Sequence, residues 1–490
     1  MLSFRHGCLR RFSTRLTPNE IVARERTLNY IESPTVLGNS PLLNNRFNPE
    51  AYLQNHPDSE HALNIRRQMD EIALLIDKMN GREQVGNKLI VFAATAFLAC
   101  SLGYTLFQFS DVNTSFTASL PSLFSILEYS TARRLLCLLA ASDLLPVDYG
   151  SDDPYMIRMV GRTKNHPFTR PLRVCVPIGL GAGMDIDSSG PAAFLKLGFG
   201  FIEVGSVNLE PSISSNENHV QSLGYSLAYD KSRQDASIGL AGVSQRLCDY
   251  IESRHDDLLT RNTITCLNIK VTRKDDVEMT FADTRLIATA DSIAFDITDI
   301  PDDKAIISII DSIEAQSFDS KSVPVIFLKV GLPQSFPPSN AVASAVKASK
   351  AVVGVSINGT GIAGGNETIT NFPVEAEMHV SGRIVRERST DAVGEWYKAL
   401  DCPNTCKEIV ASGGVFCGKD ALDKIESGAS IINVLTAFVV DGFPVARRIK
   451  TQLSVQLMNK GYYNLDEAIG AKHREASDRL KKAARMRKRF

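Results

Sequence analysis

Eight short apolar runs, rich in β-branched residues, alternate with helical segments between residues 173 and 438, and this alternation limits the fold more than any other feature. The runs are RVCVPIGLG, GFIEVGSV, TITCLNIKV, DSIAFDIT, VPVIFLKV, AVVGVSIN, EIVASGGV and SIINVLTAF. Such alternation is typical of parallel sheets, and eight strands over about 300 residues favour a closed (β/α)8 TIM barrel of the α/β class. The residues that directly follow each strand then face the active site.

The composition fits a globular body with attachments at both ends. The 490 residues are 44% hydrophobic and 22% charged, which excludes a disordered chain and a polytopic membrane protein. The net charge of -1 combines +4 in residues 1–19, +7 in residues 472–490 and -12 between them. Nine scattered cysteines exclude a secreted disulfide framework. The C-x3-C pair Cys402 and Cys406 indicates a loop with two thiols, and we predict no metal site.

The first 88 residues indicate a targeting segment followed by a helix. Residues 1–25 begin with MLSFRHGCLRRFSTRLT, which is rich in Arg and Ser and free of acids. This composition is typical of a mitochondrial transit peptide; a basic disordered tail is the alternative. Residues 26–88 are predicted to form a polar, amphipathic helical extension, because apolar residues recur at near-helical spacing in SEHALNIRRQMDEIALLIDKM.

Residues 89–110 carry no charge and no proline. A helix of this length spans about 33 Å, enough for a hydrocarbon core of about 30 Å. We therefore predict a single membrane-spanning helix, with a buried soluble helix as the alternative. Residues 120–160 contain a second apolar segment that Arg133 and Arg134 interrupt. This pattern suits a small helical hood at the membrane surface.

The stretch from Ala411 to Thr436 indicates phosphate binding. Gly413 and Gly414 end the seventh run, a helix follows, and the eighth run ends near Thr436. Glycines let backbone N–H groups approach a phosphate closely, and TIM barrels bind phosphate in the loops after their seventh and eighth strands.

Four segments add to the indication from the glycine loop. They are IGLGAGMD, LGFGFIEVGSV, SGGVFCGKDALDKIESGAS and EAIGAKHR. Through them the sequence, from about residue 125 to residue 474, resembles the class 2, quinone-dependent, mitochondrial dihydroorotate dehydrogenases. The resemblance implies an FMN-binding barrel over residues 165–470 and a single-pass location in the mitochondrial inner membrane, in contact with its lipid. It also implies ubiquinone as the electron acceptor, in the synthesis of pyrimidines.

The resemblance further implies a set of residues that hold the flavin. They are Ala182, Gly183, Ser206, Lys329, Asn358, Ser381, Gly382, Gly413, Gly414 and Thr436. In the family, the lysine that matches Lys329 lies near the N1–C2 carbonyl edge of the flavin, where a cation stabilises the reduced, anionic form. A solvated strand end is the alternative for Lys329.

The substrate motifs depart from the family pattern. The family's N-x-S-S-P-N-T motif places Asp296 at the first Asn, Asp299 at the catalytic Ser and Asp302 at the Thr, with Pro301 at the second Asn. Asp299 is thus the implied catalytic base, and Asn268, Asp296 and Asp302 are the implied substrate contacts. Other family positions also change: N-R-Y-G-F-N becomes KSRQDA (231–236), the lysine of A-A-G-F-D-K becomes Ile186, and the N-K of G-K-N-K becomes Thr272-Arg273.

The charges that these changes introduce lead to an expectation about function. Dihydroorotate is an anion, and at about 4 Å and an effective dielectric near 20 each like-charge contact costs on the order of 4 kcal/mol. We therefore predict impaired or lost catalysis, a pseudoenzyme kept as a structural or accessory subunit of an inner-membrane complex. One alternative is active oxidation of dihydroorotate to orotate with ubiquinone. Another is an FMN enzyme with a less anionic substrate.

Two regions outside the barrel motifs give less specific indications of function. Ser222 stands nearest to the arginine that the family uses in its quinone tunnel, and the neighbouring His219 is interpreted as a surface residue. The tail over residues 471–490 is strongly basic. A solvated terminus is the simpler interpretation, contact with RNA or acidic lipid is the alternative, and no specific nucleic-acid recognition is predicted.

Overall fold

The computed structural model describes residues 60–474 except 121, 162–165, 168, 214–219, 223, 230–235, 320–321, 333–338 and 363–377. The chain forms two compact units, Met1–Leu102 and Gly103–Phe490. The predicted transit peptide, His219, residues 231–235 and the tail beyond residue 474 lie outside the described residues.

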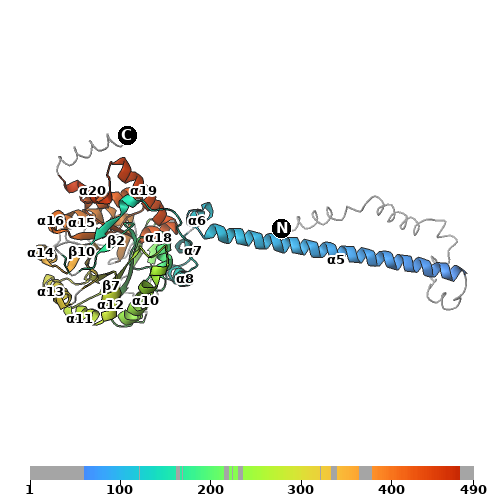
Figure 1. Ribbon diagram of the computed structural model, residues 1–490, viewed down its shortest axis with the longest axis horizontal. Helices are drawn as coiled ribbons and strands as arrows, with labels where there is room; N and C mark the ends of the chain where they lie inside the picture. The colour runs from blue at the N-terminus through green and yellow to red at the C-terminus, as the bar shows by residue number, and fades with distance from the viewer. Residues whose placement is uncertain are drawn as a thin grey trace. The chain divides into compact units, whose positions relative to one another are not determined.

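Residues 60–109 form one continuous helix, α5 (Glu60–Phe109) (Figure 1). It joins the described part of the predicted helical extension to the predicted membrane-spanning segment. Within it, Val91–Phe109 is long and apolar enough to cross a membrane by length and composition. Phe92 and Phe97 are 72% and 73% exposed. Exposing large apolar side chains to water is unfavourable, so these residues mark an interaction surface.

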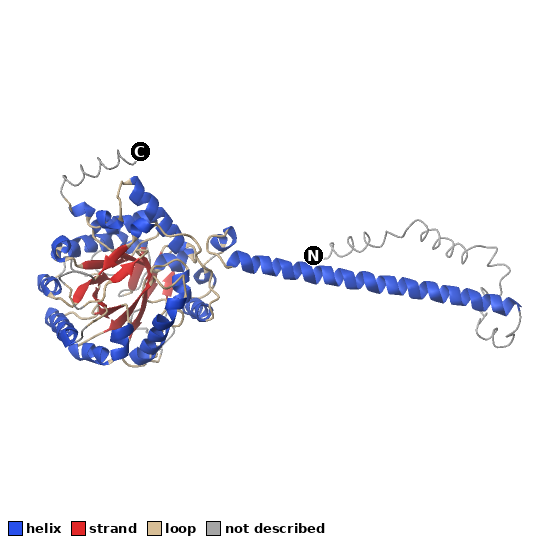
Figure 2. Ribbon diagram, in the orientation of Figure 1, coloured by secondary structure: helices blue, strands red, loops and turns tan. Residues whose placement is uncertain are grey.

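Eight parallel strands close into a barrel, which confirms the predicted (β/α)8 fold. They are β3 (Ile178–Leu180), β4 (Phe201–Val207), β7 (Ile264–Lys270), β8 (Ser292–Asp296), β9 (Val325–Val330), β10 (Val352–Ile357), β13 (Glu408–Ser412) and β14 (Ile431–Val434). Each predicted run contains one of these strands. The strands are apolar runs because both of their faces are buried, one in the barrel interior and one under the helices. Figure 2 shows the helices around the strands.

The helices around the barrel bury their apolar faces against the strands; in α17, for example, Ala421, Leu422 and Ile425 are buried. The surrounding helices are α9 (Pro191–Lys196), α10 (Gly239–Ser253), α11 (Lys274–Ala282), α12 (Thr284–Thr289), α13 (Asp303–Asp319), α14 (Asn340–Ala348), α15 (Arg386–Ala399), α16 (Cys402–Thr405), α17 (Gly418–Ser427), α18 (Thr436–Asp441), α19 (Val445–Asn459) and α20 (Leu465–Ala468). Single 3-10 turns are η2 (Pro154–Met156), η3 (Arg254–Asp256), η4 (Arg383–Val385) and η5 (Ala471–His473).

An apolar cluster fills the N-terminal end of the barrel. It contains Phe201, Ile264 and Val325, which are the first residues of β4, β7 and β9. The hairpin of β1 (Arg158–Val160) and β2 (Leu172–Val174) adds Val160 and Val174 to it. Because this end is packed solid, the chemistry belongs at the opposite, C-terminal end of the strands.

A second, antiparallel sheet contributes residues to that C-terminal end. Its order is β11 (Thr360–Ile362), β12 (His379–Gly382), β6 (Ser226–Tyr229) and β5 (Val220–Ser222). The pairing of Ser381 with both Thr360 and Leu227 joins segments that are far apart in the sequence.

The region of the predicted hood, residues 120–160, contains α7 (Leu123–Ile126) and α8 (Tyr129–Ala141), and α6 (Ser115–Ser119) directly precedes it. The last residues of this range, Arg158–Val160, form strand β1. At the two ends of α16, Cys402 is buried and Cys406 exposed, and both are free thiols.

Candidate functional site

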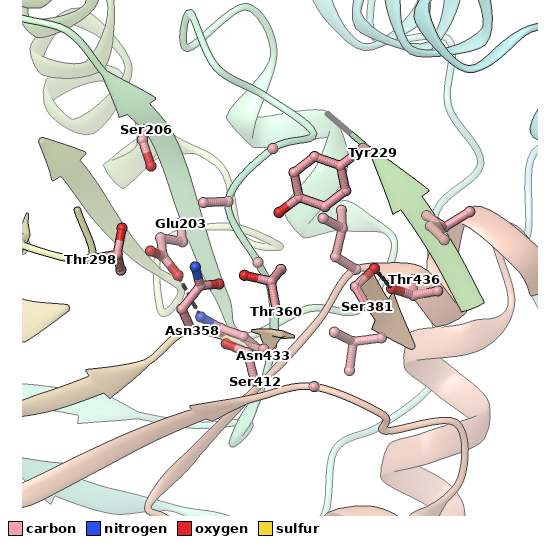
Figure 3. A pocket seen from close by; sticks show the side chains of 18 of the residues that line it. Glu203, Ser206, Tyr229, Thr298, Asn358, Thr360, Ser381, Ser412, Asn433 and Thr436 are labelled. Atoms are coloured by element: carbon pink, nitrogen blue, oxygen red, sulfur yellow. Dashed lines mark hydrogen bonds between the residues drawn. The ribbon is translucent and has the colours of Figure 1, made fainter. Parts of the chain in front are cut away.

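A cavity of about 320 Å³ opens at the C-terminal ends of the barrel strands. Its volume is in the range of small-molecule sites. Its lining includes all of the predicted flavin residues except Gly382, namely Ala182, Gly183, Ser206, Lys329, Asn358, Ser381, Gly413, Gly414 and Thr436. Residues from six barrel strands or the loops after them thus line one cavity. Figure 3 shows Ser206, Asn358, Ser381 and Thr436 around it. Gly382 directly follows Ser381 in β12.

The floor of the cavity holds a buried ion pair. Lys329 Nζ lies 2.5 Å from Glu203 Oε1, and Asn433 Nδ2 donates to Glu203 Oε2 at 2.8 Å. Burial opposes the charged form of Lys329, but Glu203 and Asp296 outweigh it and hold the pKa of this lysine above its ordinary value. The structure therefore keeps a cation at this position, and Lys329 is not a solvated strand end.

Sequence reasoning missed Glu203 and Asn433. Each is a polar residue inside an apolar strand, in the runs GFIEVGSV and SIINVLTAF. A buried charge requires a partner, so an acid in one apolar run and a lysine in another were the signal that could have paired Glu203 with Lys329.

A chain of hydrogen bonds crosses the substrate side of the cavity. Asn268 Nδ2 donates to Ser206 Oγ at 2.7 Å, and Ser206 Oγ donates to Asp296 Oδ2 at 2.9 Å. The backbone N–H of Thr298 donates to the other oxygen, Asp296 Oδ1, at 3.0 Å. Asp296 lines the cavity with both oxygens engaged, whereas Asn268 lies behind Ser206 and is not among the described lining residues.

The other two aspartates of the altered motif differ in position. Asp299 lines the cavity, and its Oδ2 lies 2.9 Å from Lys270 Nζ. Asp302 is exposed and accepts the backbone N–H of Lys304 at the start of α13, so it does not line the cavity. The expectation of three aspartates around the substrate is therefore corrected to two, with Lys270 beside one of them.

Tyr229 is a further lining residue that sequence reasoning missed. It ends β6, and its hydroxyl points into the cavity toward Thr360 (Figure 3). Burial raises the pKa of Tyr229, against the opposing effect of a hydrogen bond with Thr360. The signal was weak, because β6 reaches the barrel only through its pairing with β12.

The opposite half of the cavity suits a phosphate. Gly413 and Gly414 have φ values of +103° and +71°, a region that favours glycine. The hydroxyls of Ser381 and Thr436 lie 3.0 Å apart beside them. The acids in the described lining are Glu203 in β4 and Asp296 and Asp299 at and after the end of β8, whereas Gly413, Gly414 and Thr436 follow β13 and β14 and offer N–H and hydroxyl donors. This donor set fits the phosphate of FMN, and Lys329 fits the flavin edge.

Comparisons with known proteins point to one family. Residues 303–457 match the family model described as dihydroorotate dehydrogenase. The mitochondrial quinone-dependent dihydroorotate dehydrogenase of Mus musculus is 26% identical over 376 residues, covering 72% of this chain and 89% of the relative. The crystal structure of the Eimeria tenella enzyme in complex with ferulenol matches with a TM-score of 0.62 and 25% identity, covering 73% of this chain and all of that one. In sequence and in fold the chain is similar to the dihydroorotate dehydrogenases.

A bacterial quinone-dependent relative matches as well. The quinone-dependent dihydroorotate dehydrogenase of Bradyrhizobium sp. (strain ORS 278) is 25% identical over 311 residues, covering 60% of this chain and 82% of the relative. This chain is dihydroorotate dehydrogenase-like, and two of its departures from the family motif, Asp296 and Asp299, line the cavity.

Proposed function

We propose that this dihydroorotate dehydrogenase-like chain is an FMN-binding protein of the mitochondrial inner membrane that has lost the turnover of dihydroorotate. The observation that carries the proposal is the ion pair between Asp299 and Lys270. Asp299 stands at the position of the family's serine base, and its Oδ2 lies 2.9 Å from the ammonium group of Lys270, so the side chain at this position is engaged in an ion pair instead of being a free hydroxyl.

The charges on the substrate side support the same conclusion. Asp296 presents a carboxylate where the resemblance expects a neutral amide, and dihydroorotate carries a carboxylate of its own. A like-charge contact there costs on the order of 4 kcal/mol at an effective dielectric near 20, which is several hundredfold in binding. The two lysines of the described lining, Lys270 and Lys329, are both paired with carboxylates already.

The residues that would hold FMN are retained. The Gly413–Gly414 backbone and the hydroxyls of Ser381 and Thr436 would bind the phosphate, and Lys329 would face the flavin ring. Bound FMN supplies acceptance of a hydride and its later release as electrons. What this chain changes is the group that removes the substrate's proton.

A flavin spectrum tests the proposal. The full chain, purified in detergent, is expected to carry oxidised flavin that stays oxidised when dihydroorotate is added without oxygen, and that dithionite bleaches. Bleaching by dihydroorotate would overturn the loss of turnover. A colourless protein that does not take up added FMN would overturn the flavin part.

A specific observation favours a second candidate, active oxidation of dihydroorotate with ubiquinone as the acceptor. Lys270 lines the cavity, and a substrate carboxylate could replace Asp299 as its partner. A less anionic substrate would fit the same pair without displacing it. A chain without any turnover is left with a structural or accessory role, and its membrane partners would be identified by co-purification.

Replacing Asp299 by serine alone is expected not to restore turnover of dihydroorotate. The serine returns the family's base, but Asp296 still repels the substrate and Pro301 still lacks the amide of the family motif. Anaerobic flavin bleaching measures the result. Asp302→Ser is the matched control, because Asp302 is exposed outside the described lining. Full activity of Asp299→Ser would show that the electrostatic argument is wrong.

A further inference from the structure

Lys424, in α17, is a completely buried lysine beneath the Gly413–Gly414 loop. Its ammonium donates to Ser389 Oγ, to Thr390 Oγ1 at 3.0 Å and to the carbonyl oxygen of Arg386 at 3.4 Å, all at the start of α15. Among the described residues, no carboxylate lies within ion-pair distance of it. Burying a charge without a partner costs free energy, so the presence of Lys424 at this position requires an explanation.

Ser389 connects this lysine to the loop. Its hydroxyl is fully buried and donates to the carbonyl oxygen of Gly413 at 3.0 Å. The carbonyl of Arg386 also lies within reach, at 3.1 Å, but it already accepts hydrogen bonds from Thr390 and Lys424. With Lys424 donating to the oxygen of Ser389, the serine proton is free to hold Gly413.

The anchored carbonyl sets the direction of the next N–H group. In a planar trans peptide, the C=O of Gly413 and the N–H of Gly414 point in opposite directions. The carbonyl faces Ser389 on the outer side of the barrel, so the N–H of Gly414 faces the cavity that both glycines line. The loop also has little room to shift, because a Cβ on Gly414 would lie 2.5 Å from the Cα of Arg386.

We propose that Lys424 is a positioning residue for a phosphate-binding loop: through Ser389 it aims the N–H of Gly414 into the cavity, and its buried charge attracts the phosphate. The cofactor part of this proposal, that the phosphate belongs to FMN, rests on the function proposed above. Burial lowers the pKa of Lys424 to about 7, with Arg386 of α15 and Lys472 of η5 acting in the same direction and Asp420 and Asp391 opposing them. A bound phosphate dianion would supply the missing counter-charge.

The test compares ligands with and without a phosphate. Lys424→Met is expected to weaken FMN binding by about tenfold or more, as for a lost hydrogen bond to a charged group, and to leave riboflavin binding unchanged. Both affinities are measured by flavin fluorescence on the detergent-purified full chain stripped of cofactor. Ser389→Ala keeps the lysine and removes the relay, so a smaller loss in the same direction is expected.

Lys407→Met is the matched control. Lys407 is also a buried lysine with a lowered pKa, about 8, because of burial, but it donates to the carbonyls of Ser349 and Val352, away from the loop. Its replacement is expected to leave the ratio of FMN to riboflavin affinity unchanged. An equal loss of both flavins in Lys424→Met would reveal a purely structural role and overturn the proposal, as would unchanged FMN affinity.

Inorganic phosphate separates this proposal from the identity of the cofactor. Phosphate is expected to raise the melting temperature of the wild-type chain and not that of Lys424→Met. If the wild type binds neither flavin, the proposed FMN function fails, but a phosphate effect that depends on Lys424 still supports the positioning role. Equal phosphate effects in both proteins would overturn it.

Discussion

Replacing Glu203 by glutamine is expected to lower the free energy of unfolding by about 3–5 kcal/mol, the usual cost of breaking a buried ion pair. Glu203 and Lys329 are only 2% and 5% exposed, so water cannot replace the lost partner of Lys329. Asn433 contacts the second oxygen of Glu203 and offers no compensating negative charge. Chemical denaturation of the detergent-purified chain, followed by circular dichroism, measures the change.

Two controls make this result specific. The double variant Glu203→Gln with Lys329→Gln removes both charges and is expected to recover a large part of the loss, because no unpaired charge remains. Glu395→Gln breaks the exposed pair with Lys398 on α15 and is expected to cost less than about 1 kcal/mol. If Glu203→Gln costs no more than Glu395→Gln, the pair at the floor of the cavity does not stabilise the barrel.

The barrel itself could be predicted from the sequence because its strands are buried on both faces. Runs such as VPVIFLKV and AVVGVSIN have no polar alternation, and helices separate them at regular intervals. The exceptions to this apolar pattern indicated the site: Lys329 is the last residue but one of β9, and Gly413 directly follows β13. Strand ends in a parallel barrel meet at one place, so residues distant in the sequence could be assigned to one cavity.

Residues placed by long-range pairing could not be predicted in the same way. Tyr229 reaches the cavity because β6 pairs with β12, a contact between segments about 150 residues apart that no local pattern specifies. Asp302 shows the opposite error. A motif alignment placed it at the substrate, but α13 begins at Asp303, and Asp302 lies at that helix start with its side chain exposed.

The N-terminal helix shows a third case. The change in composition near residue 88 predicted a boundary between a polar extension and a membrane-spanning segment, yet the backbone continues as one helix, α5. The hydrophobicity of the side chains determines which solvent a helix prefers. The backbone hydrogen bonds do not depend on it, and they continue until a helix-breaking residue such as proline. No proline occurs between residues 60 and 109, so the helix continues through the change in composition.

Replacing Gly359 by alanine is expected to abolish flavin retention in the purified protein. Gly359 follows β10 and lines the cavity, and a Cβ there would lie 2.4 Å from the backbone nitrogen of Gly413 and 2.6 Å from its Cα. The hydrogen bond from Ser389 to the Gly413 carbonyl holds the loop from its other side. The added methyl must therefore push aside the N–H groups that would bind the phosphate, and the flavin absorbance that remains after purification measures the loss.

Gly331→Ala is the matched control, since Gly331 directly follows the neighbouring strand β9 and the nearest atom to a Cβ there, the carbonyl oxygen of Thr298, is 3.8 Å away. It adds the same methyl group at ordinary contact distance, so flavin retention is expected to stay at the wild-type level. Overpacking costs about 1–3 kcal/mol, which a barrel of this size tolerates, so Gly359→Ala should fold while losing its cofactor. A Gly359→Ala protein that retains flavin as Gly331→Ala does would show that the Gly413 backbone does not hold the phosphate, and the assignment of this half of the cavity would fall with it.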